Sequence, residues 1–162
     1  QNYRAGFLQL VINSINGNDI KKYEGIEVLN SMETYFPSNL LPYNNDKLEL
    51  QVAQLYHLLG NEDEYRNRLD NIEDRENVKN ETLLSVGQMY LSELNDFENA
   101  YRVLNKLYLD QPNNIEFMYA TVQSLARMDR LSEAIEILKT WLTTHPNDKQ
   151  IQQLLNSLQG QV

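Results

Sequence analysis

One stretch of this chain recurs at a fixed distance, and this recurrence limits the folds that the chain can adopt. Segment 96–112 and segment 130–146 each carry a small residue, a large apolar residue four positions later, and a proline twelve positions after the small one. Each matching pair is 34 positions apart: Ala100 and Ala134, Leu104 and Leu138, Pro112 and Pro146. A period of this length is the size of one helix–turn–helix unit that stacks on its neighbours. Together with the absence of sustained apolar/polar alternation, it predicts an all-α fold without a sheet.

Weaker copies of the same unit occupy the rest of the chain. Gly25 stands twelve residues before Pro37, at the spacing of the small residue and the proline in the recurring stretch. From Tyr90 to Ala100 there are ten residues where the pattern has nine, which predicts one inserted residue near 92–95. We expect repeats at about 2–38, 46–78, 80–114 and 115–148, and a terminal helix at 147–160. All of them are assigned to a single domain that covers 1–162.

The ends of two helices can be predicted from capping chemistry. Asn80 is the expected N-cap of the third repeat. In the terminal segment, Asn147 and Gln150 have the spacing of a capping box, and Gly160 is the expected stop. Apolar residues of this segment follow helical spacing opposite an amide-rich face: Ile151, Leu154, Leu155 and Leu158. An apolar face opposite a polar one suits a helix that caps the end of a stack.

The spacing resembles the tetratricopeptide repeat. The third repeat matches the family positions 4, 7, 8 and 11 with Leu83, Val86, Gly87 and Tyr90. The resemblance implies a right-handed superhelical solenoid of about four antiparallel helix pairs plus a C-terminal capping helix. It also implies a non-catalytic protein–protein interaction scaffold that binds a peptide segment or a neighbouring domain in a concave groove.

The resemblance further implies which residues face that groove, at positions 2, 5, 9 and 12 of each first helix. They are Lys47, Leu50, Gln54 and His57 in one repeat; Glu81, Leu84, Gln88 and Leu91 in the next; and Glu116, Tyr119, Gln123 and Ala126 in the last. Position 5 is apolar and position 9 is Gln in all three repeats. We expect an exposed apolar row flanked by amides that can pair with a peptide backbone. The open alternative is that packing between repeats buries position 5.

One subgroup of the family clamps the C-terminal carboxylate of chaperones with Lys at position 5 and Asn at position 9. Here position 5 is Leu50, Leu84 or Tyr119, so the cationic half of that clamp is missing. Chaperone-tail binding is therefore not carried over to this chain.

A second resemblance covers residues 25–72 and leads to an alternative function. Its motifs are Tyr35-Phe36-Pro37, Leu41-Pro42-Tyr43 and the run 56–60. They resemble the soluble C-terminal region of a Bacteroidota family of polytopic membrane proteins similar to protein O-mannosyltransferases. This resemblance implies a soluble accessory domain of a membrane-bound glycosyltransferase-like protein, on its extracytoplasmic (periplasmic) side. The catalytic residues of such a protein would lie in its membrane part, so none is assigned here.

Composition narrows the partner classes. A net charge of −9 disfavours nucleic acid, because affinity for phosphates depends on Lys and Arg. Cysteine is absent, which excludes thiolate catalysis and Cys-ligated zinc, and no apolar run is long enough to insert into a membrane. Carboxylates at 62–64 and 73–74 alternate with Arg66, Arg68 and Arg75, a pattern typical of a solvated helix face. We predict no catalytic, cofactor-binding or metal-binding residue, and a protein or peptide partner of neutral to basic character.

Overall fold

The computed structural model describes residues 3–38, 40–43 and 45–160. These residues form nine α-helices and no strand, which confirms the all-α prediction. The helices are α1 (Tyr3–Ile15), α2 (Asp19–Tyr35), α3 (Asp46–Leu58), α4 (Glu62–Glu73), α5 (Asn80–Ser92), α6 (Phe97–Asp110), α7 (Ile115–Arg127), α8 (Leu131–Thr144) and α9 (Lys149–Gln159). They make four helix pairs followed by one further helix.

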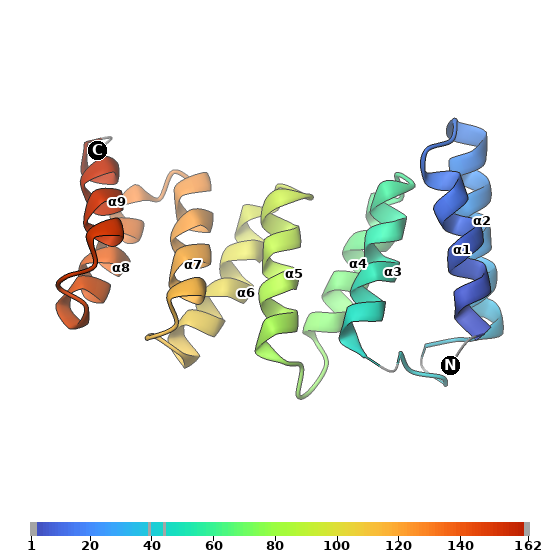
Figure 1. Cartoon of the computed structure of the whole chain (residues 1–162), viewed down its shortest axis with the longest axis horizontal. Helices are drawn as coiled ribbons and strands as arrows, with labels where there is room; N and C mark the ends of the chain where they lie inside the picture. Colours follow the sequence, from blue (N-terminus) through green and yellow to red (C-terminus); the bar gives the residue numbers. More distant parts are fainter. Residues whose placement is uncertain (1–2, 39, 44, 161–162) are drawn as a thin grey trace. The chain divides into compact units, whose positions relative to one another are not determined.

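The chain divides into two compact units, unit 1 (Gln1–Glu76) and unit 2 (Asn77–Val162). In unit 1, α1 packs on α2 and α3 on α4, and α1 also lies beside α3. In unit 2, each helix from α5 to α8 packs on the next one, and α5 lies beside α7. Within each unit the first helices of the pairs form one layer and the second helices lie behind them (Figure 1). The single domain over 1–162 stays a prediction.

Three turns between paired helices share one backbone device. The residue just before the second helix's N-cap has a left-handed conformation in each: Gly60 (φ 84°), Asn95 (φ 51°) and Asp129 (φ 59°). Glycine has no Cβ to clash there, and Asn and Asp tolerate this conformation better than other residues. These residue types therefore allow the tight reversal that makes each pair antiparallel.

The inserted residue predicted near 92–95 lies in the turn between α5 and α6. In the second repeat, the N–H of Asn61 donates to the carbonyl of Tyr56, five residues earlier, at 2.8 Å. In the third repeat, the N–H of Asp96 donates to the carbonyl of Tyr90, six residues earlier, also at 2.8 Å. The turn absorbs the extra residue without losing its closing hydrogen bond.

Small residues lie where paired helices pack most closely, as the repeat pattern predicts. Ala100 and Ala134 are completely buried. At Gly87 in α5, a Cβ atom would come within 2.5 Å of the Leu104 side chain in α6. Gly25 in α2 is also restricted, because side-chain atoms of Ser14 and Leu59 would lie 2.9 Å from a Cβ atom there. Larger side chains at these sites would force the helices apart.

Two predicted N-caps are wrong by one residue. Lys79, whose backbone is extended, is the N-cap of α5, and Asn80 is the first helical residue. Helix α5 starts there because the N–H of residue 83 already donates to the Lys79 carbonyl, and no side chain caps this helix. At α9 the cap is Asp148 rather than Asn147, and its carboxylate accepts from the Ile151 N–H at 3.1 Å.

Helix α9 packs on α8, as expected of the terminal helix. Ile151 and Leu158 are buried, whereas Leu154 and Leu155 are half-buried. Gly160 ends the helix with φ −76°, so it stops α9 without the left-handed turn that glycine allows.

Candidate functional site

The structure separates the predicted groove residues into exposed and covered ones. In unit 1, Lys47 is exposed, Gln54 and His57 are half-buried, and Leu50 is buried. In unit 2, five are exposed (Glu81, Gln88, Glu116, Tyr119 and Gln123), Ala126 is half-buried, and Leu84 and Leu91 are buried.

The expected exposed apolar row at position 5 is therefore wrong for two of its three members. Leu50 is 9% exposed and Leu84 is 7% exposed, while Tyr119 is 36% exposed. In unit 2 the reason is that α7 packs beside α5, so Leu84 lies at the base of the space between them together with Phe117. Both leucines are buried, and for Leu84 the alternative, burial by repeat packing, holds.

A hollow of about 380 Å³ lies between the N-terminal ends of α5 and α7. Its lining residues are Lys79, Asn80, Glu81, Leu84, Gln111, Asn114, Glu116 and Phe117. Three of them, Glu81, Leu84 and Glu116, belong to the groove predicted from sequence. The structure thus brings residues that are 35 positions apart in the chain to one depression of the surface. We call it the α5–α7 hollow.

The walls and base of the α5–α7 hollow differ in chemistry. Leu84 and Phe117 are buried and form an apolar base, whereas Glu81 and Glu116 are exposed. Asn114 caps α7 by accepting from the N–H groups of Glu116 at 3.0 Å and Phe117 at 3.3 Å. The hollow therefore combines an apolar base with a polar, carboxylate-bearing rim.

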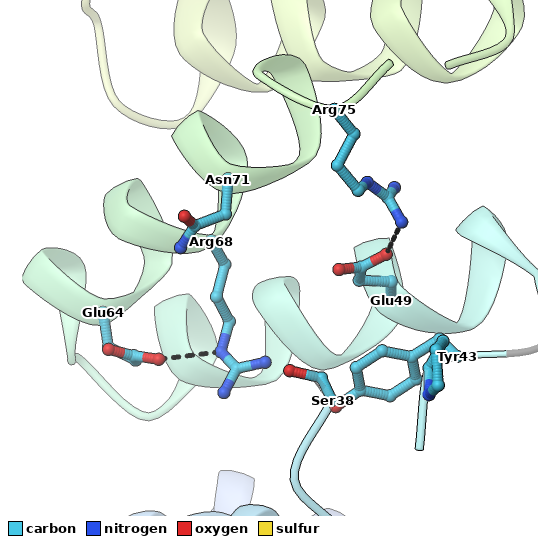
Figure 2. Close-up of a pocket in the computed structure, with 8 residues that line it drawn as sticks. Ser38, Tyr43, Glu49, Glu64, Arg68, Asn71 and Arg75 are labelled. Carbon is cyan, nitrogen blue, oxygen red and sulfur yellow. Dashed lines mark ion pairs between the residues drawn. The ribbon is translucent and has the colours of Figure 1, made fainter. Parts of the chain in front are cut away.

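Unit 1 holds a second depression, which the sequence analysis did not predict as a site. It has a volume of about 520 Å³ and lies among Ser38, Pro42, Tyr43, helices α3 and α4, and Arg75 (Figure 2). The residues that line it are Ser38, Pro42, Tyr43, Glu49, Glu64, Arg68, Asn71 and Arg75. We call it the polar pocket.

The polar pocket contains ion pairs on two sides (Figure 2). Arg68 lies 2.9 Å from Glu64. It also lies 3.4 Å from Glu33 in α2, and its side chain is only 12% exposed. Arg75 lies 2.8 Å from Glu49. Two of these contacts are ion pairs without the geometry of a directed hydrogen bond: Arg68 Nε with Glu64, and Glu49 Oε2 with Arg75.

The interpretation of this charged segment as a solvated helix face is therefore wrong for Arg68. Its guanidinium also lies over the Tyr56 ring, 4.7 Å from the ring centre. The pairing with Glu64 has the i, i+4 spacing that a sequence can reveal. Glu33 is 35 residues away, and no local pattern points to it.

Burial shifts the titration of groups around the polar pocket. Burial raises the pKa of the Glu49 carboxyl, and the positive charge of Arg75 opposes this rise only in part. Burial likewise raises the pKa of Tyr56 to about 12. The pKa of Tyr43 rises because of burial and because its hydroxyl donates to Glu33. Because Arg68 and Arg75 each pair with nearby carboxylates, this arrangement fits an ion-pair network within unit 1.

The two histidines pack against aromatic rings. His57 Nδ1 lies 2.8 Å from Glu62, and its ring centre is 5.0 Å from that of Tyr65. His145 stacks on Trp141, with ring centres 4.1 Å apart, and its Nδ1 lies 3.3 Å from the Trp141 carbonyl. Across the part of the chain that the structure describes, there is no group of three His, Asp or Glu residues that could hold a metal ion.

Comparison with known proteins agrees with the repeat architecture. Residues 91–158 match the family model described as tetratricopeptide repeat, a stretch that lies within unit 2 and extends from the end of α5 into α9. No curated protein and no solved structure matches the chain. Among the described helices, none is both long and apolar enough to cross a membrane. The resemblance to a membrane-protein family stays a prediction. Four helix pairs, a terminal helix and the family match over 91–158 support a tetratricopeptide-like helical repeat.

Proposed function

We propose that this chain is a non-catalytic interaction module that binds an extended peptide segment along the first helices α5 and α7 of unit 2. The segment belongs to a separate protein or to a neighbouring domain. The family match supports this proposal, because tetratricopeptide repeats are commonly protein–protein interaction modules.

The observation that carries the proposal is the α5–α7 hollow. Glu81, Leu84 and Gln88 follow one another at i, i+3 and i+7, so they share one face of α5. Glu116, Tyr119 and Gln123 have the same spacing on α7. Because α5 lies beside α7, two similar rows of side chains form one surface, with the hollow at one end.

The exposed side chains on this surface suit a peptide backbone. Gln88 and Gln123 each offer an amide donor and an amide acceptor, and both are exposed. Tyr119 adds an exposed ring and a hydroxyl beside them. Aromatic residues of this kind often dominate the binding energy of an interface. The net charge of −9 favours a partner of neutral or basic character.

A peptide display library provides the test, with the full chain as the target. Peptides that bind should lose affinity about fivefold or more in Tyr119→Ala, the range of a moderate hot spot. The matched control is Tyr23→Ala, because Tyr23 is also an exposed tyrosine, 65% exposed, but lies on the second helix α2. Leu84→Ala is not a suitable probe, because Leu84 is buried and its truncation is expected to lower stability.

Binding that ignores Tyr119→Ala, or a footprint confined to α6 and α8, would contradict the proposed surface. Thermal unfolding of both variants shows that any loss of affinity does not come from a loss of structure.

A further inference from the structure

We infer that the α5–α7 hollow accepts a lysine or arginine side chain of the bound segment, with its charged end between Glu81 and Glu116. The inference rests on the proposed function and names the side chain that the surface selects.

The first argument is charge. Glu81 and Glu116 each occupy the second position of their helix and are exposed. In the described part of the chain, neither carboxylate forms an ion pair. Lys79 is the single cation among the lining residues, and it pairs with neither of them. The rim therefore carries an excess of negative charge that a cationic side chain can neutralise.

The second argument is shape and polarity. Acidic residues in the first turn also stabilise the helix dipole, and this role alone would account for one carboxylate on each helix. It does not account for the buried Leu84 and Phe117 at the base of the same hollow. Lysine and arginine have an apolar stem and a charged end, so they match an apolar base below an acidic rim. A neutral apolar side chain matches only the apolar base, and an acidic side chain matches neither feature.

Unit 1 provides an internal example of the same chemistry. There, Arg68 lies between two carboxylates, 2.9 Å from Glu64 and 3.4 Å from Glu33, above the ring of Tyr56. In the α5–α7 hollow, two carboxylates and an aromatic ring come together without an arginine of the chain's own. A basic side chain from a partner would complete a similar arrangement.

The experiment starts from the peptides selected on the full chain and measures their affinity by fluorescence anisotropy. Selected peptides should carry Lys or Arg at one fixed position. Glu81→Gln and Glu116→Gln should each weaken binding about twofold to fivefold, as expected for partly solvated ion pairs. The effect should shrink between about 0.1 M and about 1 M salt, because salt screens exposed charges.

The matched control is Glu98→Gln. Glu98 is likewise the exposed second residue of its helix, α6, but it does not line the hollow. Replacing the basic residue of the peptide with citrulline, which is neutral and similar in shape, should weaken binding to the unaltered chain. In the double variant Glu81→Gln/Glu116→Gln, the same replacement should have little further effect. That result would show that the basic side chain and the two carboxylates take part in one interaction.

Different failures separate the inference from the proposed function. Selected peptides without a fixed basic residue, but sensitive to Tyr119→Ala, would overturn the inference and leave the interaction surface in place. An equal loss of affinity in Glu98→Gln would show a general effect of the acidic surface and would also overturn it. If no peptide is selected at all, both the proposed function and the inference fail.

Discussion

Unit 1 and unit 2 are both built from antiparallel helix pairs, but different kinds of contact join the pairs within each unit. In unit 1, polar groups connect the first pair with the second: Tyr56 donates to Asn30 at 3.1 Å, and Arg68 pairs with Glu33. Arg4 donates to the backbone carbonyls of Phe36 and Leu41. In unit 2, α6 packs directly on α7, and the buried residues on these helices are mainly apolar.

The difference explains where the family pattern is recognisable. The family match covers 91–158, a stretch within unit 2, where apolar and small residues recur at regular spacing. Unit 1 depends partly on side chains that are 26 to 37 positions apart in the chain, and such pairs leave no periodic pattern. A repeat can therefore keep its architecture after its pattern has degenerated, if polar contacts replace part of the apolar packing.

The first helices show the same contrast. Helices α1 and α7 both have 13 residues, yet α1 buries only Val11, whereas α7 buries seven residues. In α1, Leu10 and Ile12 remain 58% and 51% exposed. Similar apolar composition does not produce similar burial, because burial depends on which helices pack on both sides.

The largest expected effect comes from deleting residues 147–162, which removes α9. Ile151 and Leu158 are buried against the rest of unit 2, and each such side chain contributes about 1.5–3 kcal/mol. The free energy of unfolding of unit 2 should fall by about 3 kcal/mol or more, a large part of a marginal stability. Hydrogen exchange resolved by peptide should show the loss in unit 2 and little change in α1–α4. If the deletion changed the protection of both units equally, the capping role of α9 would be contradicted.

Overpacking a small-residue position should have the next largest effect. Ala134 is completely buried, so Ala134→Leu should lower the free energy of unfolding by about 1–3 kcal/mol. Urea denaturation measures the change, with Ser132→Leu as control, because Ser132 lies on the same helix but is exposed. An unchanged midpoint for Ala134→Leu would show that the repeat register is misplaced.

Arg68→Met tests whether polar contacts stabilise unit 1. It should cost about 1–2 kcal/mol, because Glu33 and Glu64 lose a partner while remaining largely covered. Arg130→Met is the control in unit 2, where the Arg130–Glu133 pair is more exposed and should contribute less to stability than the Arg68 pairs do. If Arg68→Met and Arg130→Met lowered the free energy of unfolding equally, the contrast between the units would disappear. Adding Glu33→Gln to Arg68→Met should restore part of the stability.

The smallest expected effect is the pH dependence of Glu49. Its pKa is raised in the folded state, so the folded state binds this proton more tightly than the unfolded state does. The stabilisation that this proton provides is complete below the unfolded pKa, about 4.3, and is lost as pH rises through the raised pKa. The stability of the chain relative to Glu49→Gln should therefore decrease with rising pH across this window. Urea denaturation at several pH values measures it, and a relative stability that increases with pH would show that Arg75 dominates.

The amino-acid sequence by itself determined the helical repeats, their period and the positions of the small residues. These features depend on local spacing. An apolar residue at every third or fourth position predicts a helix, and Ala100 and Ala134 mark where a second helix closely contacts its partner helix. The terminal helix was predictable for the same reason. The N-caps of α5 and α9 were missed by one residue, because several neighbouring residue types can start a helix.

Only the tertiary structure decided which of the predicted groove residues are exposed and what the charged residues of α4 contact. Helical periodicity places Leu84 and Tyr119 at equivalent positions, but the packing of α7 beside α5 buries the first and leaves the second exposed. Arg68 pairs with Glu33 because the fold brings α4 next to α2 at that point. Burial and long-range pairing depend on how helices pack in three dimensions, and a one-dimensional pattern does not contain that arrangement.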